Sequence, residues 1–275
     1  MEKWLIFCLS VMILASCMDE TSSDWNELIS DSIEVRKEFA EQYRKENSSF
    51  FQGSDWSQSM LDTLIMVYPE GAWPYRTKSI PFTKRGDYHI SHPLLEESLA
   101  RDSSESLYYY SWLTLFHYRD YDRAYELLDA YDQLTPNGRD YAMGMNVNYL
   151  KGLALRQQGK CEQAILEFDK VIREEGSVAD IYNYVYRGIC RYHLQEYTEA
   201  HADFDRAIQL QENCSMAHFY KALSYRRTGN IAAAIRRMEK AGEHIARGNK
   251  KNHPYYEVFD EVHLMMVRDS LAQWR

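Results

Sequence analysis

The chain has 275 residues, of which 45% are hydrophobic and 27% charged, with only 12 Gly and 6 Pro. This composition supplies enough apolar material for a sizeable core and is typical of a globular protein. The net charge of −9 argues against general nucleic-acid binding, which requires a basic face. Most of the acidity lies between Cys17 and Glu70, where twelve Asp and Glu stand against four Lys and Arg.

The first residues have the layout of an export signal. A short start that contains Lys3 precedes an apolar run over residues 4–15. This run is shorter than the ~20 residues that a membrane-spanning helix needs, and it has the length of a secretory signal. We therefore expect residues 1–16 to be a signal peptide that takes no part in the fold.

The sequence LASC at residues 14–17 resembles the lipobox of bacterial lipoproteins. The resemblance implies that Cys17 becomes the first mature residue and carries diacylglycerol and an N-acyl chain such as palmitate, and two or three chains anchor a protein stably. Met18 at the next position favours the outer membrane, and the acidic residues that follow resemble the export tag of surface lipoproteins in the Bacteroides group. Residues 17–37 are then a lipidated acidic tether and a first helix. The alternative is an ordinary cleaved signal with a coincidental Cys.

Behind the signal, a spacing of about 34 residues recurs. A frame that starts at Ile181 has Gly188 at position 8, Ala200 at position 20 and Phe204 at position 24. Two further clear frames have Gly152, Ala164 and Phe168 (from Met145) and Ala222, Ala234 and Met238 (from Ser215) at these positions. Weaker copies start near Glu38, Ala72 and Glu105. The pattern resembles the tetratricopeptide repeat (TPR).

The resemblance implies an all-α, right-handed TPR superhelix, an α-solenoid of about five to six helix pairs over residues 38–248. Small residues at positions 8 and 20 let the two helices of a repeat approach closely, and the large residue at position 24 fills the gap toward the next repeat. The stretch 38–71 keeps only the second half of the pattern. From Pro254 on, within residues 249–275, Val258 and Val262 belong to an apolar spacing that predicts one capping helix over the open end.

Three cysteines besides Cys17 remain in the mature chain, namely Cys161, Cys190 and Cys214. No two of them have metal-ligand spacing. An exported protein can form disulfides, so one bridge is possible, but the odd count also leaves room for free or buried thiols.

The sequence gives little support to an enzyme. It contains no Gly-rich phosphate loop, no HExxH, no GxSxG and no CxxC. His89 and His92 are three residues apart on an expected helix, but no third ligand follows at helical spacing. We therefore expect no catalytic residue, no metal and no cofactor.

TPR proteins usually bind ligands on the concave face formed by the first helix of each repeat, helix A. Transferring the family's binding positions to this sequence gives an aromatic and basic set without Asp or Glu. The set comprises Trp73, Arg76, Lys84, Tyr109, Phe116, His117, Tyr149, Arg156, Gln157, Tyr182, Tyr192, His193, Phe219, Arg226 and Arg227. Such a face suits an extended peptide with acidic or aromatic side chains, because Arg binds carboxylates in a forked geometry. Packing between helices is the alternative role of each aromatic.

These features together predict a non-enzymatic, lipid-anchored TPR scaffold that binds protein or peptide partners at a bacterial outer membrane. A glycan- or nutrient-binding surface lipoprotein is the alternative, with sugars stacked on Tyr and Trp rings. Many functions share this fold, so the fold alone does not choose between them.

Overall fold

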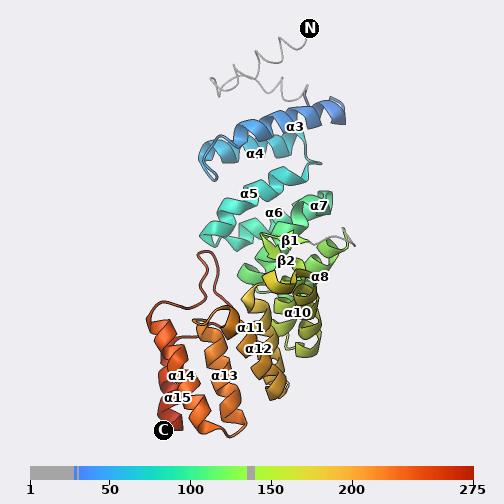
Figure 1. Cartoon of the computed structure of the whole chain (residues 1–275). Helices are drawn as coiled ribbons and strands as arrows, with labels where there is room; N and C mark the ends of the chain where they lie inside the picture. The colour runs from blue at the N-terminus through green and yellow to red at the C-terminus, as the bar shows by residue number, and fades with distance from the viewer. Residues whose placement is uncertain (1–27, 30, 135–139) are drawn as a thin grey trace. The chain divides into compact units, whose positions relative to one another are not determined.

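The computed structural model describes residues 28–29, 31–134 and 140–275 (Figure 1). The chain divides into two compact units, Met1–Ser106 and Leu107–Arg275. The lipobox and Cys17 lie outside the described residues, as does Pro136, which the sequence places at the end of a repeat. No helix in the described part is long and apolar enough to cross a membrane.

Unit 1 contains two helix pairs and the start of a third. The helices are α3 (Ile33–Asn47), α4 (Asp55–Val67), α5 (Ala72–Arg85), α6 (Tyr88–Arg101) and the first residues of α7 (Ser103–Leu113). Ser32 and Ser54 cap α3 and α4 by accepting from backbone N–H groups. The core between α3 and α4 includes Phe39, Leu61 and Leu64.

Unit 2 continues with helices in pairs and ends with one single helix. Its elements are the π-helical turn η1 (Thr114–Tyr118), α8 (Tyr121–Asp132), β1 (Tyr141–Ala142), β2 (Met145–Asn146), α9 (Val147–Gln157), α10 (Cys161–Glu175), the 3₁₀ turn η2 (Gly176–Val178), α11 (Ile181–His193), α12 (Tyr197–Leu210), α13 (Ser215–Arg227), α14 (Ile231–Ala246) and α15 (Leu264–Trp274). The strands β1 and β2 form one short antiparallel hairpin before α9.

Repeat position 15 ends helix A with a left-handed residue in all five frames from Ala72 on. Their φ values lie between 55° and 82° at Gly86, Arg119, Gly159, Gln195 and Gly229. A left-handed residue after the last helical turn lets backbone N–H groups satisfy the terminal carbonyls. The five helix pairs therefore turn with the same local geometry, even where the residue is not glycine.

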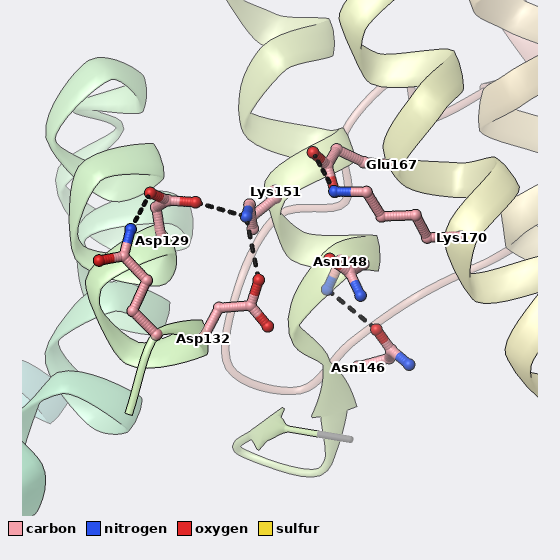
Figure 2. Close-up of polar contacts among 8 residues, drawn as sticks. Asp129, Asp132, Asn146, Asn148, Lys151, Glu167 and Lys170 are labelled. Carbon is pink, nitrogen blue, oxygen red and sulfur yellow. Dashed lines mark hydrogen bonds and ion pairs between the residues drawn. The ribbon is translucent and has the colours of Figure 1, made fainter. Parts of the chain in front are cut away.

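A ladder of ion pairs joins successive repeats and was not anticipated from the sequence. Each pair links a basic residue at position 7 of helix A to an Asp at position 25 of the preceding repeat. The pairs are Asp62–Lys78, Asp129–Lys151, Asp169–Arg187 and Asp205–Lys221. Figure 2 shows that Lys151 also reaches a second carboxylate: Nζ lies 2.6 Å from Asp129 and 3.2 Å from Asp132.

The expected capping helix is shorter than predicted, which corrects one boundary. We predict a helix from Pro254, but α15 begins at Leu264. It packs on α14, where the missing side chain of Gly242 leaves space for Val267. Residues 249–263 form no helix or strand; Val258 and Val262 are buried in this segment. We call residues 249–263 the strap.

Candidate functional site: the helix A face of unit 2

The strap lies against the first helices of the repeats in unit 2. It is the long loop between α14 and α15 in Figure 1. Its side chains contact α7 with η1, α8, α9 and α11, and one of its backbone carbonyls also contacts α11. We call this surface the helix A face, defined by Trp112, Phe116, Tyr149, Arg156, Tyr182 and Tyr186. It is the face on which TPR proteins are expected to bind ligands.

Aromatic rings make the first set of strap contacts. The Tyr256 ring stacks on Phe116 at 3.9 Å and meets Trp112 edge-on at 5.7 Å. Phe259 is stacked on the same Phe116 ring at 5.3 Å and is buried. Such pairs add about 0.5–1.5 kcal/mol each beyond the area they bury. Phe116 is therefore the centre of an aromatic cluster that takes two rings from the strap.

Carboxylates make the second set of strap contacts. Asp260 accepts a hydrogen bond from Arg156 at 2.8 Å, and both side chains are mostly buried, at 15% and 14% exposed. The same guanidinium lies 3.1 Å from His193. Glu257 pairs with Arg119 at 2.5 Å, but both side chains are largely exposed, and such pairs contribute little. The Arg156–Asp260 pair is therefore the main polar anchor of the strap.

One main-chain contact completes the docking. The hydroxyl of Tyr186, on α11, donates to the carbonyl oxygen of Phe259 at 2.9 Å. Burial and the nearby Asp260 charge raise the pKa of Tyr186, so that the hydroxyl keeps the proton it donates. This bond recognises backbone and not a side chain, which is how a groove binds an extended segment of varied sequence.

Lys251, near the start of the strap, lies in an unusual environment for a cation. Its Nζ donates to Tyr149 Oη at 2.9 Å and lies 3.6 Å from the ring centre of Tyr182. Desolvation lowers the pKa of Lys251 from 10.5 to about 8, although the charges of Asp180 and Cys214 act in the opposite direction. The loss of water therefore outweighs the effect of these two charges on the pKa of Lys251.

This pKa makes strap docking dependent on pH. A lysine with a lower pKa in the docked strap than in a released one gives up its proton on docking, so docking strengthens as pH rises from about 8 toward 10.5 and is constant below that window. We expect the hydrogen-exchange protection factors of strap amides to rise several-fold from pH 7.5 to 9.5, with about 20-fold as the upper limit.

The control for this prediction is Lys251→Met, which keeps the aliphatic contacts and removes the titrating group. Its strap should have the same protection factor at both pH values. A rise of equal size in the variant would assign the pH dependence to another group. His117 and His253 do not confuse this window, because burial lowers their pKa from 6.5.

A pocket of about 460 Å³ opens where the strap begins. Its walls include Tyr149, Tyr182 and Tyr256, together with Lys251 and Asn183. Asn183 is 2% exposed, and its Oδ1 has no hydrogen-bond partner, whereas its amide group donates to the Asp180 carbonyl. The pocket thus adds polar groups to the edge of the helix A face.

The structure brings some of the predicted binding residues together at the strap. Tyr149, Arg156 and Tyr182 contact it directly, as does Phe116. His193 is bonded to Arg156, and the charge of His253 contributes to the lowered pKa of His117. The site residues that the sequence analysis did not identify are Trp112, Arg119, Tyr186 and the strap itself.

Other predicted residues lie elsewhere. In unit 1, Trp73 is buried beneath Arg44, and Lys84 donates to Gln52. In unit 2, Tyr109 and Phe219 are buried in the core. Arg76 belongs to unit 1. Among the described contacts within unit 2, Gln157, Tyr192, Arg226 and Arg227 do not touch the strap, and Arg227 donates to Tyr192. Within unit 2, the strap contacts therefore involve only part of the predicted set.

The three cysteines of the mature repeats are buried in unit 2. Cys161, Cys190 and Cys214 are free and buried. Cys161 and Cys190 are hydrogen-bonded to each other, which lowers the pKa of Cys161 and raises that of Cys190. Within the described ranges, no group of three His, Cys, Asp or Glu could hold a metal ion.

Comparison with known proteins agrees with the paired helices of unit 2. Residues 149–211 and 187–244 match the family described as tetratricopeptide repeat. These residues carry TPR repeats. A search of the curated proteins finds no match to the sequence. The TPR assignment therefore rests on the repeats themselves and on their fold.

Solved structures with TPR repeats share the fold. MamA MSR-1 is 25% identical, with a TM-score of 0.52 over 64% of this chain and 98% of its own. YrrB, a TPR protein with an unusual peptide-binding site, is 16% identical, with a TM-score of 0.53 over 67% of this chain and 91% of its own. PilF of Pseudomonas aeruginosa is 18% identical, with a TM-score of 0.56 over 77% of this chain and 92% of its own. The predicted all-α TPR solenoid is confirmed, and the repeats indicate a protein-interaction scaffold.

Proposed function

We propose that this protein is a non-enzymatic adaptor that binds a segment of a partner protein on the helix A face of unit 2. It acts at the bacterial outer membrane, to which acyl chains on Cys17 anchor it. The anchor rests on the lipobox resemblance of residues 14–17.

The observation that carries the binding function is the docked strap. A stretch of chain with acidic and aromatic side chains, bent at residues 254–256 and in a turn at 259–260, already lies on this face, held by Arg156, Phe116 and Tyr186. The same three groups can hold a partner segment of the same chemistry, since two of them recognise side chains and one recognises backbone. No described contact of the strap requires that the bound segment belong to the same chain.

The test is a pull-down from solubilised native membranes with the mature chain. The face variant combines Phe116→Ala with Arg156→Glu. The matched control combines Phe219→Ala with Arg226→Glu, since Phe219 in unit 2 is as deeply buried as Phe116 and neither control residue contacts the strap among the described contacts. We expect the mature chain and the control to recover the same discrete protein and the face variant to lose it. Recovery by all three would place binding on another surface, and recovery by none would remove the support for an adaptor.

The anchor is tested separately. Cells fed with labelled palmitate should label the wild-type chain but not Cys17→Ala, and the variant should leave the outer-membrane fraction on a density gradient. A variant that stays in that fraction without label would show that a protein contact and not a lipid holds the chain there.

A further inference from the structure

The strap resembles a bound ligand more than a structural connection. Its aromatic and carboxylate anchors lie close together in the sequence, from Tyr256 to Asp260. Tyr255 is 68% exposed, and the side chain of Glu257 is 81% exposed. The connection from Gly248 to Leu264 could be made by a loop that avoids the helix A face, so the contacts of the anchors need another explanation.

We propose that the helix A face of unit 2 binds a partner segment in exchange for the strap. The segment presents an aromatic ring and a carboxylate four residues apart, as Tyr256 and Asp260 do, with a second aromatic residue directly before the carboxylate. This inference rests on the proposed adaptor function and adds the chemistry of the partner and its regulation: the strap occupies the site until a segment of this kind displaces it.

Three features of the docked strap oppose its docking. Asp260 has a left-handed backbone, with φ of 53°, which Asp tolerates better than most residues but which still costs more than the common extended or helical conformations. Its Oδ2 is buried without a hydrogen-bond partner. Lys251 is held where its cation is desolvated. A partner segment with its carboxylate on a relaxed backbone and no lysine would bind the same groups without the backbone cost and without the buried lysine.

The strap nevertheless has the advantage of being tethered. A segment on a short linker competes at an effective concentration of the order of millimolar, so a free segment must bind well to displace it. If the strap is docked in nine molecules of ten, the apparent affinity for a partner is reduced about tenfold. The strap therefore acts as a threshold that admits only well-matched or locally concentrated partners.

The experiment uses a fluorescent peptide with the sequence of residues 254–263, PYYEVFDEVH, and the mature chain. In the opened chain, Tyr256→Ala, Phe259→Ala and Asp260→Ala release the strap and leave the face intact. We expect the opened chain to bind the peptide at least tenfold tighter than wild type, as measured by fluorescence anisotropy. Adding Arg156→Glu to the opened chain should abolish binding.

Tyr255→Ala is the matched control, because the exposed Tyr255 side chain makes no described contact with the helix A face. This variant should bind the peptide with the same affinity as wild type. A second variant, Lys251→Met, removes the desolvated cation, tightens the strap and should weaken peptide binding severalfold. This arm remains informative if the opened chain, checked by circular dichroism, does not fold.

Equal affinity of the wild-type, opened and Lys251→Met chains would overturn the proposal, as would an opened, folded chain that does not bind the peptide. A wild-type dimer that the peptide dissociates would assign the strap to a neighbouring copy and would also overturn it. If the pull-down recovers no partner but the opened chain binds the peptide, the exchange with the strap stands and only the proposed membrane partner is contradicted. The two proposals can therefore fail separately.

Discussion

Asp205→Ala is expected to lower the free energy of unfolding of unit 2 by about 3 kcal/mol, the lower end of the range for breaking a buried ion pair from one side. Lys221, its partner in the ladder, has a side chain only 3% exposed, whereas the Asp205 side chain is 56% exposed. Removing the carboxylate leaves a buried ammonium group that lies over the Tyr225 ring, 5.5 Å from its centroid. Urea unfolding followed by circular dichroism measures the change.

The opposite substitution, Lys221→Met, should cost much less. It removes the buried charge and fills the space with an apolar chain, and the abandoned carboxylate can be hydrated. Asp129→Ala is the matched control within the ladder: Lys151 keeps Asp132 at 3.2 Å, so its loss should be smaller than that of Asp205→Ala. Equal losses for Asp205→Ala and Lys221→Met would mean that the pair acts as a surface ion pair and not as a buried one.

The ladder shows a limit of reading one sequence. Its members stand at positions 7 and 25, and each pair joins two different repeats, for example Asp169 and Arg187. Taken alone, a charged residue at either position is what the solvent-exposed face of any helix would also show. Only the stacking of one repeat on the next brings the two charges together, so the pairing follows from the tertiary structure.

The strap shows a different limit. The apolar spacing at Val258 and Val262 fits a helix, and it predicts one. The competing factor is the helix A face, which offers Phe116 and Arg156 to the side chains of Tyr256 and Asp260. Local periodicity contains no information about such distant partners. The sequence analysis expects an acidic or aromatic ligand on this face, and it does not anticipate that the chain itself places such side chains there.

The joints of the repeats were predictable, because a close approach of two helices leaves few choices of residue. Gly188 in α11 faces Phe204 in α12, and a Cβ added to this glycine would stand 2.7 Å from the Phe204 ring. In the preceding repeat, a Cβ added to Gly152 would likewise stand 2.6 Å from the Phe168 ring. These distances are the structural reason why a small residue at position 8 accompanies a large one at position 24.

The second large effect is therefore expected at this joint. Gly188→Ala should lower the free energy of unfolding, because overpacking costs about 1–3 kcal/mol and exceeds the gain of up to about 1 kcal/mol from the better helix propensity of alanine. Phe204 is fully buried and has little room to move away. Gly188→Leu should cost more and broaden the unfolding transition. Thermal and urea unfolding of both variants measure this order.

The chain itself supplies the compensating substitution. In the repeat from Ser215, positions 8 and 24 are Ala222 and Met238, and both are fully buried. Methionine is unbranched and adapts to irregular space, so it tolerates the methyl group that a phenylalanine ring would meet. Gly188→Ala combined with Phe204→Met should recover most of the stability that Gly188→Ala loses, whereas Phe204→Met alone leaves a space beside Gly188 and should be destabilising. If the two losses simply add in the double variant, the two positions do not form one joint, and the repeat pattern at positions 8 and 24 has another cause.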